Sequence, residues 1–155
     1  MNDWSKAPVF GIRSEGAPWV IRPSAYGLLE DRDGRVAVVR SRDGTFLPGG
    51  GVEAGEMPED AIRRETLEEC GLIVRPVRSV TRAVQFAYSS SERAHFEKRS
   101  TFMECAIEGS DRTHLQAGHE LFWVDEEMAT RILTHESHGW AVLQWMRRTR
   151  PDADR

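Results

Sequence analysis

Three glutamates spaced for one helical face are the residues of this chain best suited to chemistry. Glu65, Glu68 and Glu69 stand at positions i, i+3 and i+4, so in a helix their carboxylates share one side. Like charges at that spacing repel by about 0.2–0.5 kcal/mol per pair. A hard divalent cation removes this repulsion, because such ions prefer carboxylate oxygens. The triplet therefore indicates a metal site, and the alternative is a solvated acidic face of a helix.

A helix over residues 58–70 must carry these glutamates, and a glycine-rich loop must precede it. Pro58 predicts the first turn, where a proline loses no hydrogen bond, and Gly71 predicts the end of the helix. Three consecutive glycines at 49–51 predict a loop whose backbone can approach a charged ligand closely. A glycine triplet alone indicates only a turn, but before a helix rich in carboxylates it indicates a binding loop.

Residues 50–72 resemble the Nudix box, the signature of the Nudix hydrolase family. The stretch reads Gly50, five residues, Glu56, seven residues, and then RETLEECGL from Arg64 onward. Every fixed glycine, glutamate and arginine position of the signature is filled. Thr66 departs from it, since the family prefers a bulky aliphatic residue there; this departure concerns local packing and not the chemistry.

The resemblance implies a role for each residue of the box. Glu65, Glu68 and Glu69 match the metal-binding glutamates, and Glu65 also matches a base. Gly49 matches a glycine whose backbone carbonyl binds metal. Arg64 matches the arginine that orients the glutamates, with Glu56 as its ionic partner. An ordinary pair between Arg64 and Glu68, worth about 0.3 kcal/mol, is the alternative for this arginine.

A further catalytic carboxylate often comes from downstream in the family. Glu120, three residues before Trp123, is the main candidate, and its alternative is an exposed glutamate at the end of a strand. Weaker candidates are Glu97, Glu104 and Glu108. Among the histidines, only His119, beside Glu120, is a residue to test.

Substrate contacts are expected at the glycine loop, through Gly50 and Gly51, and on a later hairpin. Tyr88 stands sixteen residues after Leu72. A tyrosine at about that distance is associated in the family with dinucleoside polyphosphate hydrolases, where it would stack on a base; otherwise Tyr88 is a strand-end aromatic. Basic residues nearby could meet phosphates or form a solvated loop: Arg93, His95, Lys98 and Arg99.

Composition limits the class of protein and its partners. A length of 155 residues predicts one domain, and 39% hydrophobic residues suffice for its core. The net charge of −4 predicts no general basic surface and no nucleic-acid partner. No apolar run reaches membrane-spanning length and no signal peptide is evident, so we expect no membrane partner and a cytoplasmic location. Cys70 and Cys105 are expected to be small core residues.

The remaining pattern predicts how the helix of residues 58–70 is framed. Residues 1–18 read as a polar arm with a short strand near 9–12, residues 108–118 as a polar loop, and residues 147–155 as a charged tail. Pro23 predicts an edge or a bulge in the first long strand. Strands are expected over 19–30, 35–40, 45–48, 72–88, 98–107 and 120–124, and helices over 126–133 and 136–149.

This arrangement predicts a mixed sheet between helices. It matches the α/β/α sandwich that the resemblance implies, as a single Nudix domain over residues 1–155 with the box and its preceding glycine at 49–72.

The resemblance implies a metal-dependent pyrophosphohydrolase with Mg²⁺ or Mn²⁺ as cofactor. Water would attack phosphorus in a nucleoside diphosphate linked to another moiety. Nucleoside triphosphates and dinucleoside polyphosphates are the leading small-molecule substrates, and the sequence does not decide between them. The chain is expected to be a monomer or a homodimer. Two alternatives are a non-catalytic nucleotide-binding module, disfavoured by the intact box, and an isoprenoid diphosphate isomerase, which would need further catalytic residues.

Overall fold

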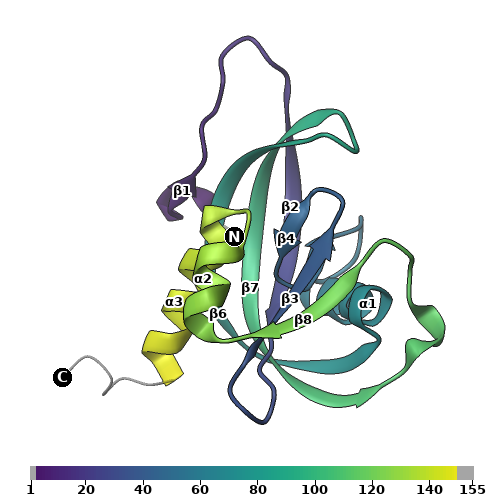
Figure 1. Ribbon diagram of the computed structural model, residues 1–155. Helices are drawn as coiled ribbons and strands as arrows, with labels where there is room; N and C mark the ends of the chain where they lie inside the picture. The colour runs from purple at the N-terminus through teal and green to yellow at the C-terminus, as the bar shows by residue number, and fades with distance from the viewer. Residues whose placement is uncertain (1–2, 150–155) are drawn as a thin grey trace.

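The computed structural model describes residues 3–149 and divides them into two β-sheets flanked by helices (Figure 1). The strands are β1 (Val9–Phe10), β2 (Trp19–Leu28), β3 (Val36–Ser41), β4 (Gly44–Phe46), β5 (Gly49–Gly51), β6 (Leu72–Ser89), β7 (Ala94–Ser110) and β8 (Glu120–Val124). The helices are α1 (Pro58–Cys70), α2 (Glu126–Ile132) and α3 (Glu136–Thr149), with 3-10 turns at Trp4–Lys6 and Arg112–His114.

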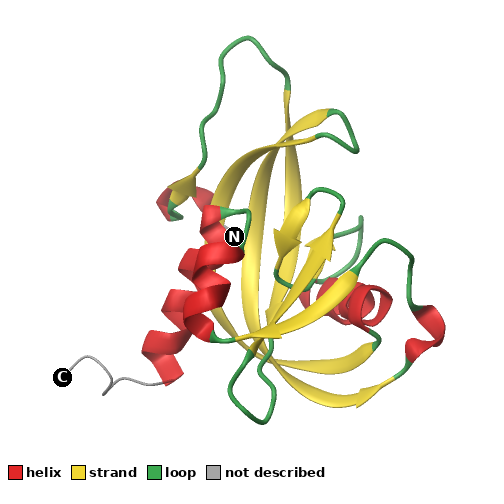
Figure 2. Cartoon of the chain, viewed as in Figure 1, coloured by secondary structure: helices red, strands yellow, loops and turns green. Residues whose placement is uncertain are grey.

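The larger sheet is mixed, and the smaller one is antiparallel. Strand order is β1-β6-β7-β2-β5 in the first and β4-β3-β8 in the second. β6 and β7 form a long antiparallel hairpin, while β2 runs parallel to β7 and antiparallel to β5. The expected mixed sheet between helices is therefore confirmed, and it is accompanied by a second, three-stranded sheet (Figure 2).

Two hydrophobic cores hold the helices on opposite sides of the sheets. Successive residues of a strand point to opposite faces. In β2, Tyr26 and Leu28 therefore pack in the core formed with α2 and α3, while Ala25 packs in the core formed with α1. β3 behaves in the same way, with Val38 in the first core and Ala37 in the second. This alternation places the glutamate helix alone on its side of the fold.

The glycines at 49–51 form a strand rather than the expected loop. β5 pairs with β2 through the partners Ser24 with Gly51 and Tyr26 with Gly49. The prediction of a loop was wrong because it considered only the preference of glycine for turns. In the fold, the backbone of β2 pairs with the glycine segment and makes it a strand. The glycines are thereby fixed in position instead of being free to move.

Pro23 lies where β2 changes from an edge strand to an interior one. In the described chain, the first half of β2 pairs only with β7, and pairing with β5 begins at Ser24. The carbonyl of Pro23 accepts a hydrogen bond from the Val52 amide at 2.9 Å. The proline nitrogen, which has no proton to donate, thus lies at the point where the pairing of β2 with β5 ends.

Most other element boundaries agree with expectation. The arm contains β1, and α3 spans the predicted residues. β7 is longer than expected because its antiparallel pairing with β6 continues to Ser110, into the stretch expected to be a polar loop. Of the charged tail, residues 150–155 lie outside the described residues. Cys70 and Cys105 are buried free thiols, and within residues 3–149 no helix combines the length and apolar character needed to cross a membrane.

Candidate active site on the glutamate helix

Local sequence fixes both ends of α1 and the face that it buries. Pro58 occupies the first turn, Met57 caps the helix without a side-chain hydrogen bond, and Gly71 ends it in the left-handed conformation, φ 66°. The buried side chains are Ala61, Ile62, Thr66 and Cys70. Because these residues face the sheet, the glutamates between them are carried at its margin, beside β5.

The glycine strand lies directly against the glutamates. The Gly49 amide donates a hydrogen bond to Glu69 Oε1 at 2.9 Å. A Cβ at Gly50 would lie 2.9 Å from Glu65 Oε1, and a Cβ at Gly49, whose φ is 145°, would lie 2.2 Å from the Ala25 carbonyl oxygen. Side chains here would push β5 away from β2 and from the carboxylates. The glycines therefore serve close backbone approach, as the sequence predicted, although they do so from a strand.

Arg64 holds the box together through several hydrogen bonds. Its guanidinium donates to both oxygens of Glu56, at 2.9 and 3.0 Å, and to Glu65 Oε1 at 2.9 Å. It also donates to the Gly51 carbonyl at 3.1 Å and lies 3.7 Å from Glu68 Oε2. The Arg64 hydrogen bonds, with the Glu53 amide, lower the pKa of Glu56 to about 2. Arg64 thus contacts the groups it was expected to orient.

Glu69 is the most deeply placed of the three glutamates. Its side chain is only 11% exposed. Burial, followed by the charges of Glu65 and Glu68, raises the pKa of Glu69 to about 8 despite the hydrogen bond from Gly49. Burial also raises the pKa of Glu65. For both carboxylates, the nearby positive charge of Arg64 is too weak to offset the effect of burial on the pKa.

The chemistry of this donor set fits a hard divalent cation. Carboxylate and carbonyl oxygens are the ligands that Mg²⁺ and Mn²⁺ prefer, and a cation would offset the burial and the repulsion that raise the pKa of Glu69. Among residues 3–149, no three His, Cys, Asp or Glu side chains converge into a ready-made ion site. In particular, Arg64 now engages the Glu65 carboxylate. Metal binding would then require the glutamate side chains to reorient around the ion.

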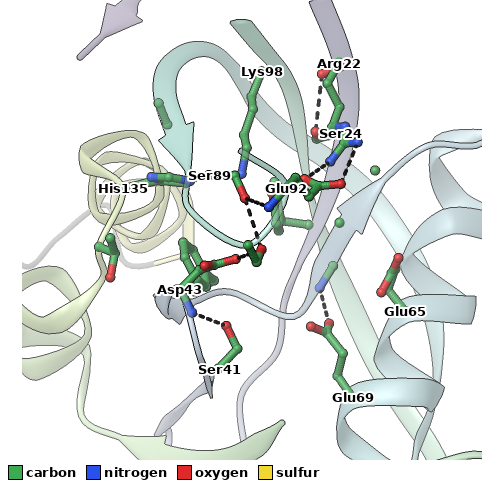
Figure 3. A pocket seen from close by; sticks show the side chains of 18 of the residues that line it. Arg22, Ser24, Ser41, Asp43, Glu65, Glu69, Ser89, Glu92, Lys98 and His135 are labelled. Atoms are coloured by element: carbon green, nitrogen blue, oxygen red, sulfur yellow. Dashed lines mark hydrogen bonds and ion pairs between the residues drawn. The ribbon is translucent and has the colours of Figure 1, made fainter. Parts of the chain in front are cut away.

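A polar pocket of about 450 Å³ opens beside the glutamates, a size typical of small-molecule sites. The predicted residues that line it are Gly49, Gly50, Gly51, Glu65, Glu69, Tyr88 and Lys98. Figure 3 shows Glu65 and Glu69 on one side and Lys98 on the other. Glu68, Arg64 and Glu56 are not among its lining residues, and Arg64 links Glu56 to Glu65.

Tyr88 and Arg93, both predicted to contact substrate, lie differently. Tyr88 lines the pocket, is 56% exposed, and packs its ring against His95 at a centroid distance of 4.8 Å. Its outer face can therefore accept a stacked ring. Arg93 lies in the turn between β6 and β7 with φ 52° and does not line the pocket. Of the basic residues with which Arg93 was grouped in the sequence, only Lys98 lines the pocket.

Glu120, the expected downstream carboxylate, does not line this pocket but lies beside it, in a shallow hollow that it shares with His119. It is 64% exposed and pairs with Arg40 at 3.2 Å. The neighbouring His119 lines the pocket instead, with its Nε2 3.7 Å from Glu69 Oε2 and its Nδ1 buried without a hydrogen-bond partner. Adjacent residues of an extended chain point to opposite sides, so only one of the two can face the glutamates. The weaker candidates Glu97, Glu104 and Glu108 pair with Arg99, Arg78 and Arg75.

Several residues of the pocket carry no local motif and were not predicted. Arg22, Ser24 and Tyr26 alternate along β2, while Asp43, Phe46, Glu92 and His135 come from separate turns and elements. The period-two spacing on β2 is a signal that could have identified the first three, because it places them on one face of the strand next to β5. The others meet only through the tertiary fold.

Comparisons with known proteins identify the family to which this chain is similar. The model of the NUDIX domain matches residues 20–146. The "8-oxo-dGTP diphosphatase" of Haemophilus influenzae is 29% identical over 108 residues, covering 66% of this chain and 74% of that protein.

Among solved structures, the MutT protein from Methanosarcina mazei Go1 is 18% identical, with a TM-score of 0.62, covering 88% of this chain and 99% of that one. An ADP-ribose pyrophosphatase from Streptococcus suis is also 18% identical, with a TM-score of 0.62, covering 84% and 93%. These two likenesses show the fold.

The chain belongs to the NUDIX family. Together, the family domain and the diphosphatase relative indicate a pyrophosphohydrolase that acts on phosphoanhydride bonds. The alternative of a purely binding module is set aside accordingly. The isomerase alternative gains nothing from Cys70, because burial raises the pKa of its thiol to about 12 and keeps it protonated near neutral pH.

Proposed function

We propose that this protein is a Mg²⁺- or Mn²⁺-dependent hydrolase of nucleoside triphosphates. The observation that carries the proposal is the shared wall formed by Glu65, Glu69 and the backbone of Gly49–Gly51 along a polar pocket of nucleotide-binding size. The relative from Haemophilus influenzae, by its name, cleaves a nucleoside triphosphate, which supports the same substrate class.

Each residue of the candidate site has a distinct role in this proposal. Glu65, Glu68, Glu69 and the Gly49 carbonyl would hold the metal, which supplies Lewis acidity and lowers the pKa of an attacking water. Glu65 would also serve as the base that accepts the water proton. Arg64, anchored by Glu56, would keep the glutamates in place. Gly50 and Gly51 would let the phosphates approach the backbone closely.

Dinucleoside polyphosphates are a second candidate class, favoured by Tyr88. Its half-exposed ring lies at the pocket, and stacking of a base on an aromatic side chain contributes about 1–3 kcal/mol. A substrate with two nucleosides would use such a platform for the second base.

A nucleotide panel tests the proposal directly. Release of phosphate or pyrophosphate would be measured with Mg²⁺, with Mn²⁺ and with chelator, for nucleoside triphosphates, dinucleoside polyphosphates, ADP-ribose and sugar nucleotides. We expect metal-dependent turnover of nucleoside triphosphates. Turnover confined to another class would reject the substrate assignment, and turnover that survives chelator would reject the role of the metal.

The variant Glu69→Gln tests the role of the glutamates. It removes a metal ligand and also a repulsive charge, so we expect turnover to fall by at least about a hundredfold while the thermal midpoint does not drop. Glu127→Gln is the matched control, because Glu127 is 75% exposed and pairs with Arg131 on α2, outside the pocket. Wild-type turnover in Glu69→Gln would contradict the assignment of this residue.

A further inference from the structure

Lys98 holds a partly buried positive charge at the pocket, and among residues 3–149 it has no direct ion pair with a carboxylate. Its Nζ lies 3.2 Å from His135 Nε2 and 5.8 Å from the centroid of the Phe46 ring. His135 is 8% exposed, and its burial, with the nearby Lys98, lowers its pKa to about 3. The imidazole is therefore neutral, so Nε2 accepts the hydrogen bond and Lys98 donates it. A neutral acceptor positions the ammonium but does not balance its charge.

The carboxylates around Lys98 are already engaged by other groups. Asp43 accepts hydrogen bonds from Ser90 at 3.2 Å and from Ser91 at 2.6 Å, one on each oxygen. Both oxygens of Glu92 accept from Arg22, at 2.7 and 3.0 Å. Within residues 3–149, no carboxylate oxygen lies within the 4.0 Å that defines an ion pair to Lys98. Burial, followed by the charge of Arg22, lowers the pKa of Lys98, although Glu92 and Asp43 oppose this shift.

A buried charge is costly unless an opposite charge meets it. Among the described residues, Asp43 and Glu92 act on Lys98 only from beyond ion-pair distance. Lys98 and His135 both line the pocket. Figure 3 shows these two side chains across the pocket from Glu65 and Glu69. One end of the pocket therefore suits a metal-bound phosphate, and the other end suits a second, directly bound anion.

We propose that Lys98, positioned by His135, binds an anionic group of the substrate at the end of the pocket opposite the glutamates. The inference rests on the proposed function, because it assumes that the phosphoanhydride lies at Glu65 and Glu69. It narrows the substrate to nucleotides with a phosphate or carboxylate beyond the bond that is cleaved. Nucleoside diphosphates linked to a neutral moiety would leave Lys98 unpaired and bind less well.

The test measures binding of inorganic phosphate by calorimetry in the presence of chelator, so that neither metal nor turnover enters. Lys98→Met should weaken phosphate binding by about tenfold to a hundredfold, as expected when a hydrogen bond to a charged group is lost. Lys6→Met is the matched control, because Lys6 is the only other lysine in the sequence and lies outside the pocket. It should bind phosphate as the wild type does.

Two further variants separate positioning from direct contact. His135→Leu removes the acceptor and should weaken binding severalfold, while His135→Gln, which keeps an acceptor oxygen, should restore part of it. Glu69→Gln should bind phosphate at least as well as wild type, because it removes a negative charge from the same pocket. Thermal denaturation of each variant confirms that it is folded.

Three outcomes of the metal-free binding experiments would overturn the inference, and a fourth comes from a separate kinetic test. The three binding outcomes are no metal-free phosphate binding by wild type, unchanged binding by Lys98→Met, and loss of binding in Glu69→Gln, which would locate phosphate at the glutamates. None of these three depends on hydrolysis, so failure of the proposed function would be seen separately in the nucleotide panel. Under turnover, phosphate should compete with substrate; non-competitive inhibition would indicate a free anion as the ligand and contradict the assignment to substrate.

Discussion

Thr66 shows how one residue of the box responds to its surroundings. It stands where the family signature prefers a bulky aliphatic side chain, and the structure buries it completely. Its hydroxyl oxygen is buried without a hydrogen-bond partner. An unsatisfied buried hydroxyl destabilises the folded state, because its hydrogen bonds to water are lost and not replaced.

We therefore expect Thr66→Val to raise the free energy of unfolding by about 1 kcal/mol. The two side chains have nearly the same shape, so the change removes the hydroxyl without opening a cavity. Chemical denaturation of both proteins is the measurement. Thr130→Val is the control, because Thr130 Oγ1 donates to the Glu127 carbonyl at 2.7 Å and its replacement should bring no gain. A Thr66→Val protein less stable than wild type would count against this account.

At the scale of elements, the start of β8 decides which side chain reaches the glutamates. His119 faces Glu69, while Glu120 faces outward to Arg40. The sequence places both in consecutive positions, and only the direction of the strand separates them. The sequence named both Glu120 and His119 as residues to test, and in the structure His119 is the one that lines the pocket.

The strand direction predicts that substitutions at two neighbouring residues affect kcat to very different extents. His119→Leu should lower kcat by at least about tenfold, or about 1.4 kcal/mol in the barrier, because Glu69 loses the polar group beside its second oxygen. Glu120→Gln should stay within about twofold, since exposed ion pairs contribute little. Steady-state kinetics on the substrate found in the panel would measure both. Loss of kcat in Glu120→Gln alone would mean that this segment turns around when substrate binds.

At the scale of the whole molecule, His138 connects parts of the fold that are distant in sequence. It is fully buried in α3, its Nδ1 accepts a hydrogen bond from the Leu47 amide at 3.2 Å, and its ring packs on Tyr26 and Phe102. Burial, followed by the nearby His135 and Lys98, holds the pKa of His138 well below its usual range. The folded protein therefore keeps this ring neutral.

The depressed pKa predicts how stability depends on pH. The unfolded chain protonates His138 near pH 6.5 and the folded chain does not, so the stabilisation is present above that pH and is lost as the pH falls below it. Between pH 7 and pH 5, protonation of His138 in the unfolded chain should lower the free energy of unfolding by about 2 kcal/mol.

Chemical denaturation at both pH values measures that dependence. His138→Asn keeps an acceptor for Leu47, and between pH 7 and pH 5 it should lose about 2 kcal/mol less stability than wild type. Other titrating groups, such as Glu69, contribute equally to both proteins and cancel in the comparison. His114→Asn, at a residue with a 60% exposed side chain, is the control and should follow wild type. Equal pH dependence in wild type and His138→Asn would refute the prediction.

The amino-acid sequence by itself determined the glutamate helix, its ends and the class of chemistry. Those features depend on residues close in sequence. Glu65, Glu68 and Glu69 share a helical face because they stand three and four residues apart, and Arg64 is only eight residues from Glu56. The strand and helix pattern likewise follows from local alternation and turn residues. For this reason the order of elements and the mixed sheet could be predicted.

Only the tertiary structure decided what surrounds the glutamates. The glycines became a strand because β2 offered them a partner, and Lys98 met His135, 37 residues away, because α3 begins beside β7. The same packing excluded Arg93 and turned Glu120 outward. Such contacts depend on the directions in which distant elements approach one another, and no short-range spacing in a sequence specifies those directions.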